Sequence, residues 1–445
     1  MGKPVKRTTR FRPVQILGGS FLALILTGTA LLMLPVCHAA GSKITFLDAL
    51  FTSTSAVCVT GLIVVDTSTA WTRLGQTVIL LLIQLGGIGI ISFGALFAIF
   101  LGRRISFHER ALIKEQFGEF STVSIFQLIP VVASSTFAIE LAGVVCLYPF
   151  FIRDFGASEA AYHSVFHSIS AFCNAGFSTF SNNLENYHGH LGVNLIICAL
   201  IVTGGIGFPV LTELLERRGP RRQLSLHTKV VLRTTALLII LGTVIIFILE
   251  TGLNEGFKEL PIASRILGSL FQSVTCRTAG FNTLPIGSMS QATLLVMILL
   301  MFIGGSPSGT AGGVKTTTFA VCIAAIGSVL RGHEDVVLFD RRVERNTVRR
   351  ALVLMVLCSG TLFLALVLLA IAGTGEILRL TFELFSAFGT VGLSTGITSQ
   401  LSVGQRLVII GMMYIGRLGP LSFVLALSNP KVVHIKQAQT GLLTG

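Results

Sequence analysis

The sequence of 445 residues predicts an all-α polytopic membrane protein built from four repeats. Two observations predict this class. The chain is 52% hydrophobic and only 12% charged, with a mean hydropathy of +0.82, which is too apolar for a soluble domain. Four similar stretches also recur, and they read FTSTSAVCVTGL, FHSISAFCNAGF, FQSVTCRTAGF and FELFSAFGTVGL. Their glycines, Gly61, Gly176, Gly280 and Gly392, lie 115, 104 and 112 residues apart, so the repeat is about 110 residues long.

Eight apolar segments are long enough for the ~18 to 20 residues that cross a bilayer. They cover residues 14–36, 75–101, 124–152, 191–215, 229–250, 291–330, 350–373 and 406–428. Two of them flank each glycine stretch, which is itself too short to cross and must re-enter on the side it left. The sequence therefore predicts four units of outer helix, pore loop and inner helix, with eight full spans plus four re-entrant half-helices.

The expected domain boundaries follow from these spans. They are a cytoplasmic N-tail 1–13, pore repeat 1 at 14–101, a cytoplasmic loop 102–123, pore repeat 2 at 124–216, a loop 217–228, pore repeat 3 at 229–330, a loop 331–349, pore repeat 4 at 350–428 and a cytoplasmic C-tail 429–445. With both termini inside, only seven of the 33 Lys and Arg face outward, which agrees with the positive-inside rule. The net charge of +13 therefore reflects topology, and no soluble basic domain for nucleic acid is present.

The four stretches are suited to surround one central cation pore. In the first, Thr45 or Asp48 can cap a half-helix that ends before Gly61. Four half-helices whose C-terminal ends point inward would direct negative dipole ends at a cation. Glycine lets the following backbone bend, so that four carbonyl groups can replace the hydration shell of the ion. Acidic residues on the outer face would either concentrate cations or cap helices.

Each half-helix carries a phenylalanine as a packing anchor. The four are Phe51, Phe166, Phe271 and Phe382, and the third is one residue out of step with its glycine.

The second span of each repeat contains a glycine-rich interruption. These are Gly86-Gly87-Ile88-Gly89, Gly204-Gly205-Ile206-Gly207, Gly304-Gly305-Ser306-Pro307 and Gly416-Arg417-Leu418-Gly419-Pro420. For the first two, close helix packing is the favoured interpretation. The third continues as GGSPSGTAGG over residues 304–313, where a regular helix is disfavoured by glycine and proline. A flexible segment just inside the pore predicts a gate.

The chain resembles the Trk/Ktr/HKT superfamily of potassium transporters, and within it the Ktr-type bacterial membrane subunit. The resemblance covers essentially all of the chain: the four loops, the broken sixth span with KTTT after it, and IGRLGPL in the last span. It implies a homodimer of two separate pores in the bacterial plasma membrane, with a cytoplasmic nucleotide-binding regulatory ring of the KtrA/KtrC type. It also implies potassium transport, often with sodium as coupling or activating ion, and no cofactor bound by this chain.

The resemblance assigns the potassium selectivity filter by position. It comprises Cys58, Val59, Thr60 and Gly61; Cys173, Asn174, Ala175 and Gly176; Arg277, Thr278, Ala279 and Gly280; and Gly389, Thr390, Val391 and Gly392. K⁺ would be held by backbone carbonyls. In the superfamily a serine in the first loop goes with sodium preference, so four glycines favour potassium. Cys58 and Cys173 depart from the Thr or Asn frequent in relatives, which matters only if side chains support the filter.

The gate is assigned to the broken sixth span and two basic residues. It comprises Gly304, Gly305, Ser306, Pro307, Ser308, Gly309, Thr310, Ala311, Gly312, Gly313, Lys315 and Arg417. Arg417 resembles the family's inner-helix arginine, which would anchor a closed loop below the filter; the alternative is a purely structural pairing. Lys315 would contact the loop or extend toward the cytoplasmic surface.

Two further charged residues lie at membrane depth. Arg277 is expected to point behind the filter to a carboxylate, either Glu383 or Asp48, because a cation facing a cation pore would block it. Glu140 lies alone in the third span and has no evident partner in the sequence.

A second function class is an alternating-access secondary transporter of another cation or small solute, which is also built from repeats with broken helices. Such carriers usually have two inverted halves, whereas four repeats in the same direction favour a pore. An enzyme is not expected, because the histidines form no HExxH motif and no nucleophile motif occurs.

Overall fold

The computed structural model describes residues 13–89, 125–215 and 224–419, and the regular secondary structure in this part of the chain is almost entirely helical. Four of its helices are long and apolar enough to cross a membrane: α1 (Pro13–Leu32), α7 (Ile125–Phe151), α11 (Leu226–Leu253) and α16 (Arg345–Ala372). We call these the outer helices. A fifth candidate is the pair α9 (Leu191–Gly205) and α10 (Phe208–Leu215), which is bent by 104°.

Each outer helix is followed by a short helix and then by an inner helix. The short helices are α2 (Phe46–Val57), α8 (Ala157–Phe172), α13 (Ile262–Thr275) and α17 (Ile377–Gly389). The inner helices are α4 (Arg73–Ile88), α9, α14 (Gln291–Phe302) and α18 (Val403–Leu418). The second expected span continues beyond Gly89, and the eighth continues beyond Gly419. Both continuations lie outside the described ranges.

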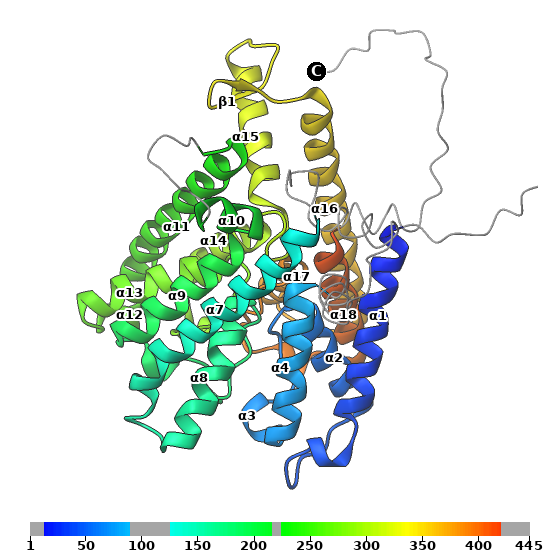
Figure 1. Cartoon of the computed structure of the whole chain (residues 1–445), viewed down its shortest axis with the longest axis vertical. Helices are drawn as coiled ribbons and strands as arrows, with labels where there is room; N and C mark the ends of the chain where they lie inside the picture. Colours follow the sequence, from blue (N-terminus) through cyan, green and yellow to red (C-terminus); the bar gives the residue numbers. More distant parts are fainter. Residues whose placement is uncertain (1–12, 90–124, 216–223, 420–445) are drawn as a thin grey trace, which may run out of the picture.

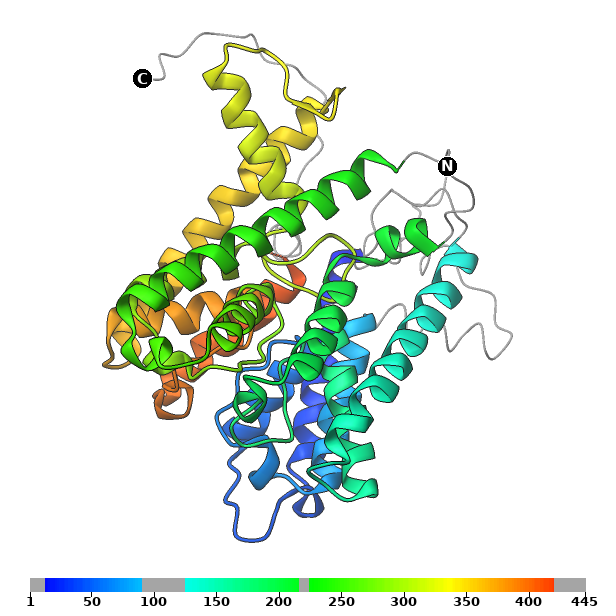
Figure 2. The same cartoon turned by 90° about the vertical axis from the view of Figure 1, so that its left-hand side faces the viewer.

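The remaining elements are small connections. They are α3 (Thr67–Ala70), α12 (Glu255–Lys258), the single turns η1 (Pro35–Cys37), η2 (Glu185–Tyr187), η3 (Ile286–Ser288) and η4 (Thr398–Gln400), and the antiparallel strands β1 (Val337–Leu338) and β2 (Arg341–Arg342). Helix α15 (Thr316–Leu330) is an apolar helix of 15 residues that follows α14 after a break. The tip of the α15–α16 pair, which carries these strands, projects beyond the other described helices (Figure 1), and a view from the side agrees (Figure 2).

The short helices are tied to the outer helices by a repeated contact. In the first three repeats a serine hydroxyl on the short helix donates to a backbone carbonyl of the outer helix. The pairs are Ser53 with Ile25, Ser168 with Glu140 and Ser273 with Ile239, at 2.7, 2.6 and 2.8 Å. A glycine three residues after each acceptor leaves room for the hydroxyl; these are Gly28, Gly143 and Gly242. Ile25, Glu140 and Ile239 therefore occupy equivalent positions.

The inner helices connect one repeat with the next. Helix α4 contacts α8, α9 contacts α13, α14 contacts α17, and α18 contacts α2. Each inner helix thus packs on the short helix of the following repeat, and the last repeat closes on the first. Because the order is cyclic, the carboxyl ends of the four short helices surround one centre.

Three inner helices end at a glycine in the left-handed region. Gly89, Gly207 and Gly419 have φ of 91°, 90° and 84°. The glycine three residues earlier packs tightly: a Cβ on Gly86, Gly204 or Gly416 would lie within 3.0 Å of the last carbonyls of α2, α8 and α17. The glycine-rich interruptions therefore provide close packing and also stop the helix, a role that sequence analysis missed.

We expect Gly416→Ala to destabilise the protein by about 1–3 kcal/mol, because the added Cβ would collide with the Phe388 carbonyl. Gly411→Ala on the same helix is the matched control, since nothing lies within 4 Å of its Cβ position. Thermal unfolding of the purified protein in detergent measures both. Equal melting temperatures for the two variants would contradict the packing argument.

Candidate cation filter and inner loop

The four glycines of the repeated stretches form a closed ring. Gly61, Gly176, Gly280 and Gly392 all lie in the left-handed region, with φ between 68° and 95°. A Cβ added to any of them would lie within 3.0 Å of a carbonyl oxygen of the next repeat. These oxygens belong, in the same order, to Ala175, Ala279, Val391 and Thr60. The glycine backbones and the carbonyls before them thus meet around one axis, where no side chain fits.

The backbone before each glycine is also left-handed at a non-glycine residue. Val59, Asn174, Thr278 and Thr390, two residues before the glycines, have φ of 56°, 59°, 78° and 50°. This conformation is costly for a residue with a Cβ, and it persists only where the surroundings impose it. All sixteen residues assigned to the filter are buried.

Hydrogen bonds from the short helices impose that conformation. The residue before each glycine donates its N–H to a carbonyl in the last turns of the short helix: Thr60 to Ser55, Ala175 to Ser170, Ala279 to Thr275 and Val391 to Ser386, at 2.8 to 3.0 Å. The acceptors all lie four residues after the phenylalanine anchors, so the third segment is one residue shorter between its acceptor and its glycine. The hydroxyls of Ser55 and Ser386 additionally accept from the N–H of Gly61 and Gly392 at 3.0 Å.

A cavity of about 180 Å³ opens directly outside the ring and is lined by all four glycines. Asp66 and Glu185 also line it. Burial raises the pKa of the Glu185 carboxyl, which accepts a hydrogen bond from Asn282 at 2.7 Å. Asp66 in addition caps α3 by accepting from the N–H of Ser68. The capping role is therefore confirmed for Asp66, and the concentration of cations by these acids stays a prediction.

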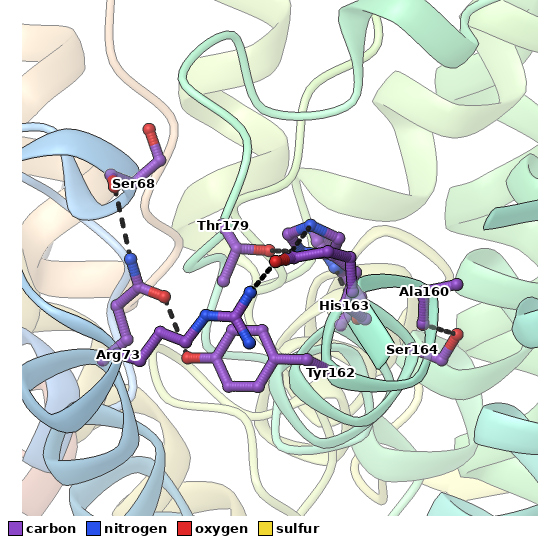
Figure 3. Close-up of polar contacts among 10 residues, drawn as sticks. Ser68, Arg73, Ala160, Tyr162, His163, Ser164 and Thr179 are labelled. Atoms are coloured by element: carbon purple, nitrogen blue, oxygen red, sulfur yellow. Dashed lines mark hydrogen bonds and ion pairs between the residues drawn. The ribbon is translucent and has the colours of Figure 1, made fainter. Parts of the chain in front are cut away.

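Ion pairs at the outer ends of the short helices link neighbouring repeats. Arg73 at the start of α4 pairs with Glu159 of α8, and its guanidinium lies 5.1 Å from the Tyr162 ring centroid. Figure 3 shows Arg73 over Tyr162, with His163 directed at Thr179, whose hydroxyl is 2.7 Å from Nδ1.

An ion pair between an inner helix and the next short helix also joins the fourth repeat to the first. Arg406 of α18 pairs with Asp48 of α2 at 2.8 Å. Asp48 also completes a capping box with Thr45 at the start of α2.

Residues 303–315, between α14 and α15, lie beneath the ring, and we call them the inner loop. Its backbone bonds to the α9–α10 break: Ser306 N–H donates to Gly205 at 2.9 Å, and Phe208 N–H donates to Ser308 at 3.1 Å. The Thr310 hydroxyl lies 3.1 Å from the side-chain amide of Asn174. Gly312 faces Thr390, whose hydroxyl would lie within 3.0 Å of a Cβ at that glycine. The loop thus touches the second and fourth filter segments from the inner side, and its Gly304 carbonyl also accepts from Arg277 of the third.

Arg417 and Lys315 hold the inner loop by its carbonyls. The Arg417 guanidinium donates to the carbonyls of Thr310 in the loop and of Gly86 in α4. Lys315 Nζ donates to Ala311 O at 2.7 Å, so its ammonium turns back to the loop and does not extend toward the surface.

The expected carboxylate partner of Arg277 is wrong. Arg277 donates to two backbone carbonyls, Gly304 O at 3.0 Å and Thr235 O at 3.5 Å. Asp48 is bound to Arg406, and Glu383 instead accepts from the hydroxyls of Ser394 and Thr398 and the N–H of Thr395. Helix α14 ends just before Gly304, so its freed carbonyls supply acceptors that a sequence search for acids does not consider.

Glu140 has partners that sequence analysis missed. Gln84 of α4 donates to its carboxylate at 2.9 Å, and the Cys173 thiol lies nearby. The signal in the sequence was a lone charge in an apolar span, which indicates a buried polar contact without identifying the other side chain.

Comparison with known proteins identifies the class. The profile of the TrkH family, described as cation transport protein, matches residues 5–435, and the chain belongs to this family of membrane transporters, which are not enzymes. The predicted superfamily is thereby confirmed.

Relatives align over nearly their whole length. The chain is 40% identical to Ktr system potassium uptake protein B of Bacillus subtilis (strain 168), covering 99% of this chain and 98% of the relative. It is 36% identical to potassium/sodium uptake protein NtpJ of Enterococcus hirae, covering 100% and 99%. The potassium transporter TrkH of Vibrio parahaemolyticus superposes with a TM-score of 0.71 at 16% identity, over 96% of this chain and 87% of that one, which shows a shared fold.

We expect Arg406→Ala to lower stability by about 3 kcal/mol, because it leaves the Asp48 carboxylate unpaired in a largely buried site. The side chains of that pair are only 19% and 10% exposed. Arg73→Ala is the control and should cost under about 1 kcal/mol, since its pair is 53% and 47% exposed. Thermal unfolding in detergent compares them, and a larger loss for Arg73→Ala would refute the ranking.

Proposed function

We propose that the chain is the membrane subunit of a potassium-uptake system and contains a K⁺-selective translocating pore. The observation that carries this proposal is the closed ring in which each filter glycine lies against a carbonyl of the next repeat. Backbone carbonyls in such a ring replace the hydration shell of a dehydrated cation. The names of the relatives, potassium uptake proteins of the Ktr system, support potassium as the ion.

The proposed architecture is eight full spans plus four re-entrant half-helices around one pore. Helices α2, α8, α13 and α17 are the half-helices, and the sixteen buried filter residues follow or end them. Four glycines favour potassium, while the name of the potassium/sodium relative NtpJ supports sodium as a coupling or activating ion. The cyclic contacts between repeats support a pore over an alternating-access carrier with two inverted halves.

The inner loop is the proposed gate, and Arg417 is the residue that holds it in position. In the present arrangement the loop touches Asn174 and Thr390 from below, while Arg417 holds Thr310. Glycine-rich backbone disfavours a single regular conformation, so a moderate force can shift the loop between positions.

That force would come from a cytoplasmic nucleotide-binding regulatory ring of the KtrA/KtrC type. The relatives named as Ktr-system proteins support such a partner. We further propose a homodimer in the plasma membrane with both termini cytoplasmic. The positive-inside bias supports this orientation.

The filter is tested by Gly61→Ser and Gly392→Ser. A side chain at either position would collide with a carbonyl of the neighbouring repeat, so we expect the potassium KM to rise about tenfold or more, equivalent to roughly 1.4 kcal/mol, with increased sodium entry. Rubidium and sodium uptake by cells lacking their own potassium systems measures both effects.

The matched control is Gly41→Ser, because Gly41 is also left-handed, with φ of 82°, but has nothing within 4 Å of its Cβ position. Unchanged uptake kinetics in both filter variants, at normal expression, would overturn the filter assignment.

The gate is tested by Arg417→Gln and by deletion of residues 306–312. Both changes remove contacts that hold the loop beneath the filter, so basal rubidium flux should rise severalfold and depend less on the regulatory ring. Arg379→Gln is the control, since Arg379 pairs with Glu376 on α17 away from the loop. Assembled, selective variants that transport less would show that the loop supports the conducting state instead.

A further inference from the structure

A buried carboxylate lies behind the second filter segment and has no part in the proposed pore. Glu140 on α7 is 4% exposed. Gln84 Nε2 donates to both of its carboxylate oxygens, at 2.9 and 3.2 Å. The Cys173 Sγ lies 3.6 Å from Gln84 Oε1 and 3.9 Å from Glu140 Oε1. In the described ranges no ion pair includes Glu140. We call Glu140, Gln84 and Cys173 the Glu140 cluster.

The fold does not require a glutamate or a glutamine at these positions, because the counterparts in other repeats are apolar residues or, in one case, a tyrosine. The carbonyl of Glu140 accepts from Ser168 as those of Ile25 and Ile239 accept from their serines. Gln84 lies two residues before the packing glycine of α4. Its counterparts in the other inner helices are Val202, Phe302 and Tyr414. A glutamate at membrane depth is costly, so its presence in one repeat alone indicates a specific task.

The cluster is directly attached to the filter. Cys173 is the first residue of the second segment, and its thiol is confined on the other side by Gly87, where a Cβ would lie 2.7 Å from Sγ. The next residue, Asn174, is left-handed and contacts Thr310 of the inner loop. The carbonyl of Ala175 then lies against Gly61 of the neighbouring repeat. A shift of Cys173 would therefore displace a carbonyl of the ring.

The cluster also reaches the support of the inner loop. Two residues after Gln84, the carbonyl of Gly86 accepts from Arg417. Helix α4 is thus fixed to the second repeat through Gln84 and to the fourth repeat through Gly86. This short part of α4 therefore connects Cys173 of the second filter segment with Arg417, which holds the inner loop.

We propose that the Glu140 cluster is a positioning site that fixes the second filter segment and thereby sets the discrimination between potassium and sodium. This inference rests on the proposed function. Glu140 does not touch the ion and acts through Gln84 and Cys173. Its role is that of a hydrogen-bond acceptor, so a glutamine, which keeps a carbonyl oxygen and can form an amide pair with Gln84, should replace it.

The test uses Glu140→Ile and Gln84→Val, which introduce the residues found at the equivalent positions of repeats 1 and 3 and of repeat 2. The full-length protein is assayed for rubidium and sodium uptake, and the ratio of their KM values is the readout. We expect both variants to reduce discrimination at least fivefold, Glu140→Gln to stay within twofold of the parent, and the double variant to be no worse than either single variant.

Thr136→Val is the matched control, because Thr136 lies one turn earlier on α7 and is buried with no hydrogen-bond partner for its hydroxyl among the described residues. Unchanged discrimination in assembled Glu140→Ile and Gln84→Val would overturn the proposal. An equal loss in Glu140→Gln would overturn it too, because charge would then matter and not hydrogen bonding. If Glu140→Ile fails to assemble, the discrimination measured for Gln84→Val alone decides whether the proposal stands.

Gly61→Ser separates this proposal from the proposed function. Altered selectivity in Gly61→Ser with parental selectivity in the cluster variants would leave the filter standing and reject the positioning role. Parental selectivity in both Gly61→Ser and Gly392→Ser would reject the filter and, with it, the inference.

Discussion

The close approach of four glycine backbones to the carbonyls of their neighbours is the constraint on which the structure depends. Because the glycine backbones and the neighbouring carbonyl oxygens are so close, each short helix must be placed accurately in depth and rotation. Three kinds of contact provide that placement. Serine hydroxyls bind the short helices to the outer helices, glycines of the inner helices seat against their last carbonyls, and ion pairs such as Asp48–Arg406 fix their outer ends.

The third repeat departs from this pattern in a coordinated way. Its segment is one residue shorter between Thr275 and Gly280, and Pro307 stands where the other inner helices have their left-handed glycine. Helix α14 stops at Phe302, and Arg277 binds the carbonyl of Gly304 that the stop releases. The early stop provides the chain length for the inner loop. One repeat thus supplies the loop, while the inner helices of the other three run on to a left-handed glycine.

Sequence analysis predicted the features that recur within one repeat. The glycine stretches identified the family, and composition identified a helical membrane protein. Contacts between repeats were less accessible, because they depend on which helices the cyclic order brings together. Gln84, remote in sequence from Glu140, was therefore not considered. Arg277 was matched to acids for a different reason: its acceptors lie in its own repeat, but they are backbone carbonyls, which no side chain marks in the sequence. The left-handed stop at Gly207 was missed because a glycine that packs and a glycine that turns look the same in a sequence.

The ring is encoded by a single polypeptide, and this has an evolutionary and a kinetic consequence. In a channel assembled from four identical subunits, every substitution appears four times and symmetry is preserved. Here a single substitution changes only one of the four repeats, so the repeated segments are free to differ from one another. Glu140 and the inner loop, each present in one repeat, illustrate this. Motion is affected in the same way. In the proposed gate a single loop would cross its barrier alone, without three copies rearranging in concert, so the steepness of any response would originate in the partner that moves the loop.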